Sequence, residues 1–169
     1  MPDGERLLAV RAHVAGRGLY GPASVGDVAA FEQTMGHPMP DLLKRTYLEV
    51  ANGGFGPKKT LSLTDTGNWF SGRADLAMGY YDFAADPDHP LPPGIVPFIN
   101  RNCSVLALID FRTSDGQMWV WDPNLCCLPH AIGPLEQSLA QWLTDWLHDA
   151  MLDGPYPQRE LSSRECPHW

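Results

Sequence analysis

Residues 47–57 of this 169-residue chain read YLEVANGGFGP, and they mark the point where a helix ends and the chain turns. The helix is predicted to open at Asp41 as its N-cap, with an apolar face supplied by Leu42, Leu43, Tyr47, Leu48 and Val50. Asn52, Gly53 and Gly54 then stop it, because Asn and Gly tolerate the left-handed conformation common at helix C-termini. We therefore expect positive φ at Gly53 or Gly54.

A second helix is expected just before this one, over residues 24–36. Ser24 can cap it, Asp27 stands where the acid of a capping box belongs, and Gly36 can end it. His37-Pro38-Met39-Pro40 then forms a rigid break, so the two helices should make a hairpin.

One more helix is expected nearer the N-terminus, over residues 5–16. Leu7, Leu8, Arg11 and Val14 fall at helical spacing, and Gly16 can end the helix.

The second half of the chain predicts strands. Apolar or β-branched runs occupy residues 95–99, 104–111, 118–121 and 125–128, and Thr113-Ser114-Asp115-Gly116 is typical of a hairpin turn. This order predicts an antiparallel meander. Before it, residues 75–85 give a weak helical period, and the proline-rich residues 86–93 predict a loop.

The last helix has the clearest pattern in the chain. Ser138 can cap it and Gln141 can complete a capping box. Its apolar positions recur at helical spacing, so the stripe should pack on the sheet: Leu139, Trp142, Leu143, Trp146 and Leu147. Trp119 and Trp121 share one face of their strand, and we expect that face to lie under this helix. The alternative is that the two tryptophans face outward as binding anchors.

Together these elements predict an α+β fold. We expect a mainly antiparallel sheet of about four to six strands, with the helices packed largely on one face. The chain should form one domain over residues 1–169, with a core over about 24–152, an N-terminal helix over 5–16 and a loose tail over 153–169.

The residues around the glycine turn resemble a known family. Met39-Pro40-Asp41-Leu42-Leu43, the YLEVANGGFGP stretch and the final Ser138-Leu139 and Trp142-Leu143 look like the SUKH superfamily. Met39 stands where that pattern has leucine, which is a tolerable apolar replacement. The resemblance implies a SUKH-like fold and a non-catalytic role in protein binding, since the superfamily includes fungal cell-wall-synthesis regulators and bacterial immunity proteins. The motif residues themselves are expected to be structural: Pro40, Leu43, Tyr47, Asn52, Gly53 and Gly54.

Composition narrows the class of protein. Hydrophobic residues make up 44% of the chain and charged residues 19%, which indicates a globular domain. No run approaches the roughly 20 apolar residues that span a bilayer, and the first residues lack an apolar secretory core. Four cysteines are too few for a disulfide scaffold of this length. We therefore expect a cytoplasmic protein that does not bind membranes.

The net charge of −8 is concentrated in one half of the chain. Residues 1–73 hold eight Lys/Arg and seven Asp/Glu, whereas residues 74–158 hold eleven Asp/Glu and only Arg101 and Arg112. Such a surface repels phosphate backbones and attracts basic proteins, so nucleic acid is not an expected partner. Charge that serves only solubility is the alternative.

Three motifs resemble a metal, a catalytic or a phosphate-binding site, but none meets the requirements of that site. Cys126, Cys127 and His130 are close in sequence, but adjacent strand residues point to opposite faces, so a zinc site is not expected. The histidines are scattered outside any recognisable catalytic motif, so no enzyme activity is expected. The glycine-rich run at residues 53–59 follows a helix rather than a strand, which favours a turn over a phosphate loop. The sequence predicts no metal and no cofactor.

Aromatic and acidic side chains gather before the strands and give a candidate partner surface. They are Trp69, Phe70, Tyr80, Tyr81, Asp82, Asp86 and Asp88. Aromatics beside acids suit an interface with a basic protein, although they could equally cover one edge of the core. The leading hypothesis is an immunity-type protein that binds and neutralises a toxin domain. A housekeeping regulator that binds a cellular protein is the alternative, and a small-ligand-binding protein is a weaker one.

Overall fold

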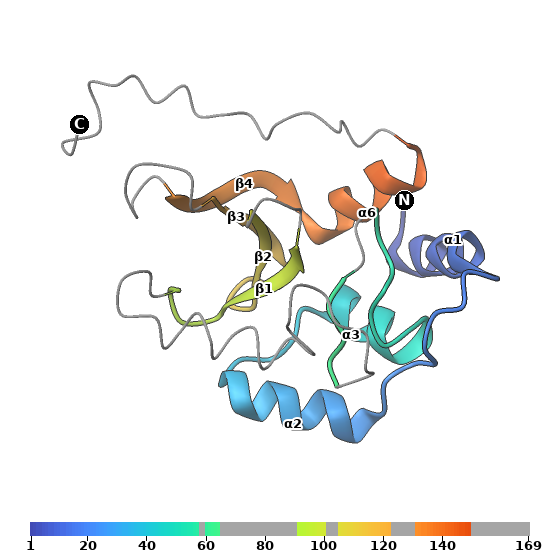
Figure 1. The fold of residues 1–169 in the computed structure, drawn as a ribbon, viewed down its shortest axis with the longest axis horizontal. Helices are drawn as coiled ribbons and strands as arrows, with labels where there is room; N and C mark the ends of the chain where they lie inside the picture. Colours follow the sequence, from blue (N-terminus) through green and yellow to red (C-terminus); the bar gives the residue numbers. More distant parts are fainter. Residues whose placement is uncertain (58–59, 65–90, 101–104, 123–130, 150–169) are drawn as a thin grey trace.

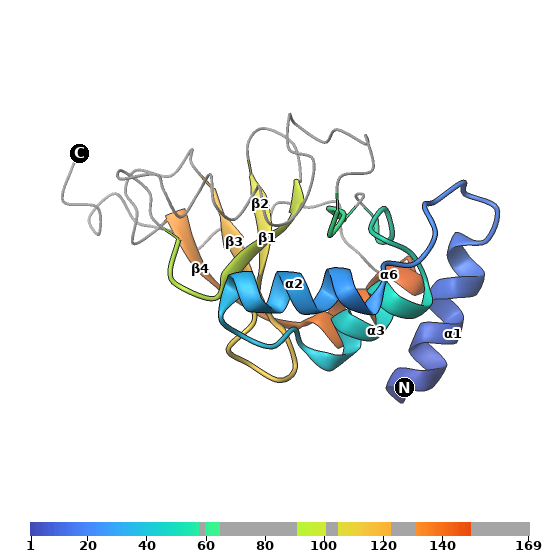
Figure 2. The same ribbon diagram turned by 90° about the horizontal axis from the view of Figure 1, so that it is seen from below.

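The computed structural model describes residues 1–57, 60–64, 91–100, 105–122 and 131–149. Their helices and strands are, in chain order, α1 (Asp3–Val14), α2 (Val25–Met35), α3 (Asp41–Glu49), β1 (Ile95–Asn100), β2 (Leu106–Asp110), β3 (Gln117–Trp121), β4 (Ile132–Ser138) and α6 (Leu139–Leu147). The strands pair antiparallel in the order β1-β2-β3-β4, so the sheet is a meander. In Figures 1 and 2, α1, α3 and α6 gather to one side of the sheet, and α2 runs across beneath it. The predicted α+β fold with a mainly antiparallel sheet is confirmed.

The helical hairpin of α2 and α3 follows its capping signals closely. The Asp27 amide donates to Ser24 Oγ at 3.0 Å, and the Ser24 amide donates to the Asp27 carboxylate at 2.9 Å, which completes the predicted capping box. The hydrogen bonds from Ser24 lower the pKa of Asp27. Gly36 ends α2 with a φ of 68°. One detail was wrong: Pro40 is the N-cap of α3, and Asp41 is already helical, where its charge complements the helix dipole.

One hydrophobic core joins the four described helices to a single face of the sheet. The sheet contributes Val96, Phe98, Ala107, Ile109 and Met118 to it. A series of tilted and edge-on rings crosses this core, from Tyr47 through Phe55 and Phe98 to Trp142, with centroid distances of 5.4, 6.3 and 5.5 Å. The predicted stripe of α6 is buried there at Leu139, Trp142, Leu143 and Trp146, while Leu147 is only partly buried.

The opposite face of the sheet has its own, smaller cluster, and it is here that Trp119 and Trp121 lie. The two tryptophans do share a face, but they do not lie under α6, so that prediction was wrong. Trp119 is paired with Leu108 and Trp121 with Leu106. Met118 faces the helices with no exposed surface. Because side chains alternate along a strand, Trp119 and Trp121 point to the opposite face.

Strand β4 was not predicted at all. It contains Gly133 and Pro134, which are poor strand formers, and its pairing is distorted by an irregularity between Gln117 and Trp119 of its partner β3. The Gln117 side-chain amide donates to the carbonyls of Leu135 and Gln137, so a side chain replaces part of the ladder. The strand expected at residues 125–128 and the helix expected at 75–85 lie outside the described residues.

Strand β4 runs directly into α6. Ser138 caps this helix as predicted, accepting from the Gln141 amide at 3.3 Å. The Gln141 side chain, however, donates forward to Asp145, which the capping-box prediction did not foresee.

Candidate functional site

The seven residues proposed from sequence as a partner surface lie outside the described residues: Trp69, Phe70, Tyr80, Tyr81, Asp82, Asp86 and Asp88. The same holds for Cys126, Cys127 and His130, the group considered as a metal site. The described part of the chain contains no cluster of three or more His, Cys, Asp or Glu side chains placed to hold a metal ion. The surfaces of the described residues are therefore considered in turn as possible binding sites for a partner.

The turn after α3 is a closed structural unit. The Tyr47 hydroxyl donates to the Leu61 carbonyl at 2.6 Å, and burial raises the pKa of this phenol. Asn52 clamps the facing segment from both ends of its amide: Nδ2 donates to Thr64 Oγ1 at 2.7 Å, and Oδ1 accepts from the Leu63 amide at 2.8 Å. The polar groups of this motif are therefore used inside the fold.

The glycines of this turn are required by both φ and space. Gly53 and Gly54 have φ values of 86° and 78°, in the left-handed region that the sequence pattern predicted. A Cβ on Gly53 would lie 2.8 Å from the Leu61 carbonyl oxygen, and one on Gly56 would clash with the Trp142 ring. The turn is therefore closely packed against the Leu61 backbone and the Trp142 ring.

Both edges of the sheet resist the addition of a partner strand. On the β1 side, the Leu61 amide donates to the Phe98 carbonyl at 3.0 Å, and Thr60 bridges Ile99. On the β4 side, Pro134 lacks an amide hydrogen, and the strand pairing is irregular. Prolines and bulges are common devices that keep edge strands from pairing with other chains. A partner of the described region would therefore not be expected to add a strand to either edge of this sheet.

The hairpin between β2 and β3 contains an ion pair between Asp110 and Arg112. Asp110 is 4% exposed and accepts 2.8 Å hydrogen bonds from Nε and Nη2 of Arg112, whose guanidinium lies 5.9 Å from the Trp119 ring. Burial opposes ionisation of Asp110, but the hydrogen bonds and charge of Arg112 outweigh it and lower the pKa of that carboxyl. The pair closes the hairpin, because the Arg112 amide also donates to Asp110 Oδ1 at 2.8 Å.

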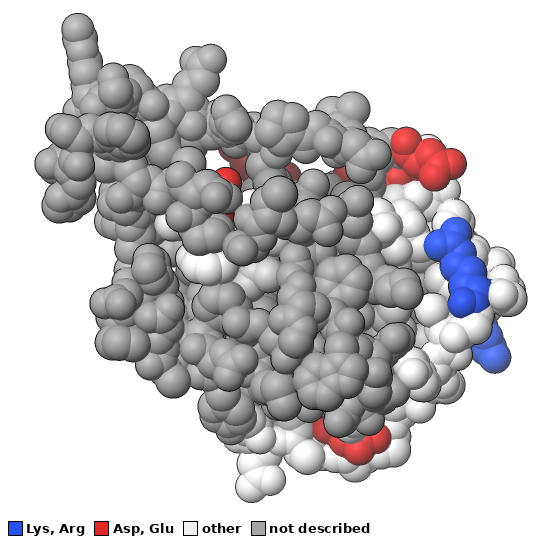
Figure 3. Space-filling model, viewed as in Figure 1, with Lys and Arg blue, Asp and Glu red and all other residues white. Residues whose placement is uncertain are grey.

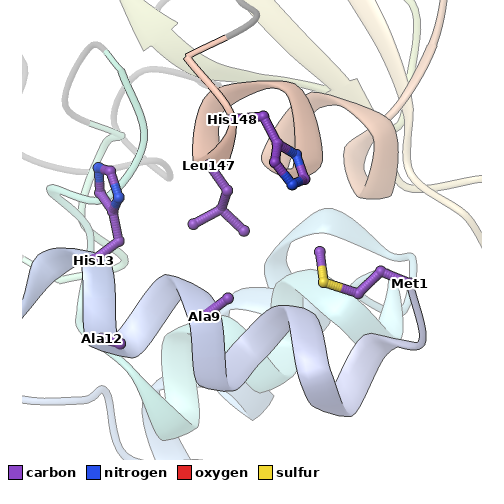
Figure 4. Close-up of a pocket in the computed structure, with 6 residues that line it drawn as sticks. All are labelled: Met1, Ala9, Ala12, His13, Leu147 and His148. Carbon is purple, nitrogen blue, oxygen red and sulfur yellow. The ribbon is translucent and has the colours of Figure 1, made fainter.

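A groove lies between α1 and the end of α6. It has a volume of about 450 Å³ and is lined by Met1, Ala9, Ala12, His13, Leu147 and His148. Figure 4 shows the imidazoles of His13 and His148 on either side of Leu147, above the two alanines of α1. An apolar floor with a few polar groups at its rim is typical of a binding site.

The sequence prediction missed this groove because it placed the core-facing stripe of α1 only partly correctly: Leu7 and Val14 are buried as expected. Leu8 belongs to the stripe predicted from sequence but is 69% exposed, whereas Arg6 was not singled out and is 6% exposed. The signal that was available is the pair Ala9 and Ala12, two small residues on one helical face.

Charges are unevenly spread around this part of the molecule. Figure 3 shows acidic side chains at the end of α6 and basic side chains over α1. On α1, Glu5, Ala9 and Ala12 fall at i, i+4 and i+7 and so share the stripe that faces the groove, while Arg11 lies on another side. The groove therefore has an acidic group beside its apolar floor.

The class of this protein follows from a match of its sequence to a known family. The sequence model of the SMI1/KNR4 family (SUKH-1) matches residues 22–147, which is most of the chain. The chain belongs to the SMI1/KNR4 (SUKH-1) family, and the SUKH resemblance stated from its motifs is confirmed. No curated protein and no solved structure was found to match it.

Family membership fits a role in protein binding, and the family is generally non-catalytic. Among the described helices, none is both long enough and apolar enough to cross a membrane.

Proposed function

We propose that this chain is a non-catalytic, immunity-type module that binds and neutralises a toxin domain. The family match over residues 22–147 is the observation that carries the proposal. A closed structural turn and two protected sheet edges support it, because they leave an ordered scaffold whose helices and loops are available to a partner.

Charge supports a basic partner. Residues 74–158 carry eleven acidic side chains against two basic ones, and several acids in the described part of that range are exposed, among them Asp115, Glu136 and Asp149. Acidic inhibitors associate quickly with basic clefts, and their association rate falls as salt is added. We place this function in the cytoplasm, with no nucleic acid or membrane as partner.

The loop sequence before β1 is the proposed contact for that partner. Asp82, Asp86 and Asp88 lie in or beside the predicted proline-rich loop over residues 86–93, and Tyr80 and Tyr81 precede them in the sequence. Trp69 and Phe70 are proposed as apolar neighbours in the same contact. Aromatic anchors with an acidic rim are the composition expected for recognition of a basic surface.

The test begins with capture of the partner by the full chain, identification by mass spectrometry, and co-expression of the identified domain to measure its toxicity with and without this protein. We expect a toxin domain whose toxicity is suppressed. A cellular protein with no toxicity would instead favour a housekeeping regulator, and the absence of any protein partner would overturn the proposal.

Association kinetics then test the loop. Asp82→Lys with Asp86→Lys should slow association with the captured partner by roughly tenfold at low salt and flatten its salt dependence. Asp115→Lys with Glu136→Lys is the matched control, since it changes the net charge equally at exposed described positions. Equal rates for the two variants across all salt concentrations would remove the loop from the contact.

A further inference from the structure

The groove between α1 and α6 is held open by fixed walls. Arg6 is buried between the two helices, where its Nε donates to Thr144 Oγ1 at 3.1 Å and its Nη2 donates to the Met1 carbonyl at 2.7 Å. At the other end, the His13 ring packs edge-on against Trp146 with centroids 4.6 Å apart. A preformed groove binds with a smaller loss of conformational entropy than one that must be assembled.

The apolar surface of this groove continues outward onto α1. Met1 is 50% exposed and Leu8 is 69% exposed, and both border the alanine stripe formed by Ala9 and Ala12. Small residues on a helix face allow close approach of another side chain or backbone. A volume of about 450 Å³ is in the range of small-molecule pockets and is large enough for one or two bulky apolar side chains.

Two exposed acidic side chains stand near the rim of the groove. Glu5 shares the helical stripe of Ala9 and Ala12, and Asp149 follows His148 at the end of α6, where the helix dipole places partial negative charge. The basic groups on this side are the amino group of Met1, which lines the groove, and Arg6, which is bound to Asp3 and to the Met1 carbonyl, whereas Arg11 lies on another face. Arg17 lies at the Trp146 end, 6.0 Å from that ring.

His148 adds a hydrogen-bond acceptor to the same rim. Its Nδ1 lies 2.9 Å from the Thr144 carbonyl oxygen. A carbonyl only accepts, so Nδ1 carries the proton in this contact, and Nε2 of the neutral ring is left as an acceptor. An ammonium or guanidinium group can donate to it.

The wall formed by α1, residues 3–14, precedes the range that matches the family, residues 22–147. The opposite wall is the end of that range, at Leu147, together with His148. The groove therefore lies between a helix outside the matched range and the end of that range.

We propose that this groove receives an amphipathic helix of the protein partner, with an apolar side chain in the groove and a flanking Lys or Arg at Glu5, His148 and Asp149. The inference rests on the proposed protein-binding function and names a second contact for it. Helices that lay their apolar face into a groove are a recurring mode of protein recognition.

Two synthetic 18-residue helical peptides provide the probes, one with leucine on one face and lysine on the other, and one with leucine and glutamate. We expect the Leu/Lys peptide to bind the full-length chain and to shift the backbone NMR signals of residues 5–13 and 147–149. The Leu/Glu peptide should bind at least tenfold more weakly. Equal binding of both peptides, or shifts confined to other residues, would overturn the charge assignment or the site.

Matched tryptophan variants test the groove itself. Ala9→Trp with Ala12→Trp fills it, whereas Ala29→Trp with Ala30→Trp places the same bulk on exposed positions of α2. The first variant should bind the Leu/Lys peptide at least tenfold more weakly than the second, with circular dichroism confirming that both are folded. If the groove variant does not fold, the map of NMR shifts on the unmodified chain decides alone.

The same pair of variants separates this inference from the proposed function. If the captured natural partner binds both variants equally well, the groove proposal fails while the protein-binding role stands. If no protein partner is captured at all, the proposed function fails independently of the groove.

Discussion

The two faces of the sheet are both apolar, but different sets of residues pack against them. On the helix side, Val96, Phe98 and Met118 belong to one core with all four described helices, and the glycine turn packs into that core without spare room. On the other side, Trp119 and Trp121 belong to a small cluster with Leu91, Ile95, Leu106, Leu108, Ala131 and Ile132.

Hydrogen bonding follows the same division. The Tyr47 hydroxyl on the helix side has a short bond to a buried carbonyl, whereas Trp119 Nε1 on the other side is buried with no partner among the described residues. Thr60 Oγ1, in the residue before Leu61, is also buried without a partner among the described residues, so the difference concerns these two aromatic side chains and not every polar group near each face. Three sets of substitutions test this division, in order of expected effect.

The largest effect is expected at the glycine turn. Gly53→Val with Gly54→Val combines left-handed strain, about 1–2 kcal/mol per residue, with a clash against the Leu61 backbone, so the total loss of stability should exceed roughly 4 kcal/mol. Chemical denaturation measures it. Gly16→Val with Gly18→Val is the control, because these glycines also have positive φ but a Cβ at either position would meet no other atom within 4 Å. Equal losses would show that the packing of the turn contributes nothing.

A smaller effect is expected from two aromatic substitutions on opposite faces. Tyr47→Phe leaves the Leu61 carbonyl without its 2.6 Å partner and should cost about 1–3 kcal/mol. Trp119→Phe removes a buried donor that has no partner, which offsets its lost contact with Arg112, so the change should stay within about 1 kcal/mol. Thermal and denaturant unfolding of both variants measures the difference. A larger cost for Trp119→Phe than for Tyr47→Phe would reverse the comparison.

The smallest effect is expected at Asp110. Asp110→Asn weakens the pair with Arg112, and because that arginine is 41% exposed, solvent screening should limit the loss at pH 7 to about 1 kcal/mol. The pKa of Asp110 is lowered in the folded state, so the unfolded chain takes up its proton first on acidification. The stability that this carboxylate contributes is therefore present at neutral pH and is lost as the pH falls below 3.8, the ordinary value, toward the folded-state pKa.

Unfolding free energies of the wild type and Asp110→Asn at pH 7, 5 and 3 check this sign. The gap between them should be widest at pH 7 and should shrink at pH 3. A gap that widens on acidification would mean that the protonated side chain, rather than the carboxylate, stabilises the hairpin.

Prediction from sequence succeeded where a few neighbouring residues decide the structure. The capping box of Ser24 and Asp27, the positive φ of Gly53 and Gly54, and the turn that ends at Gly116 all depend on local backbone chemistry. The buried stripe of α6 was also predictable, because five large apolar residues at helical spacing leave one face for the core.

Prediction failed where two local patterns were equally apolar or where distant contacts replaced local preference. Both faces of β3 carry large apolar side chains, so the sequence pattern does not tell which face packs on the helices. Only the pairing of β3 with β2 decides that Met118 faces them. Strand β4 forms despite Gly133 and Pro134, because β3 and the Gln117 side chain supply its partners.

The candidate groove belongs to this second class. The spacing of apolar residues was enough to predict the two amphipathic helices that form it. The burial of Arg6 against Thr144 and the exposure of Leu8 follow from the packing of α1 on α6, because the burial of a long charged side chain depends on a partner 138 residues away in the chain. Local periodicity describes one helix at a time, whereas a groove exists only between two helices.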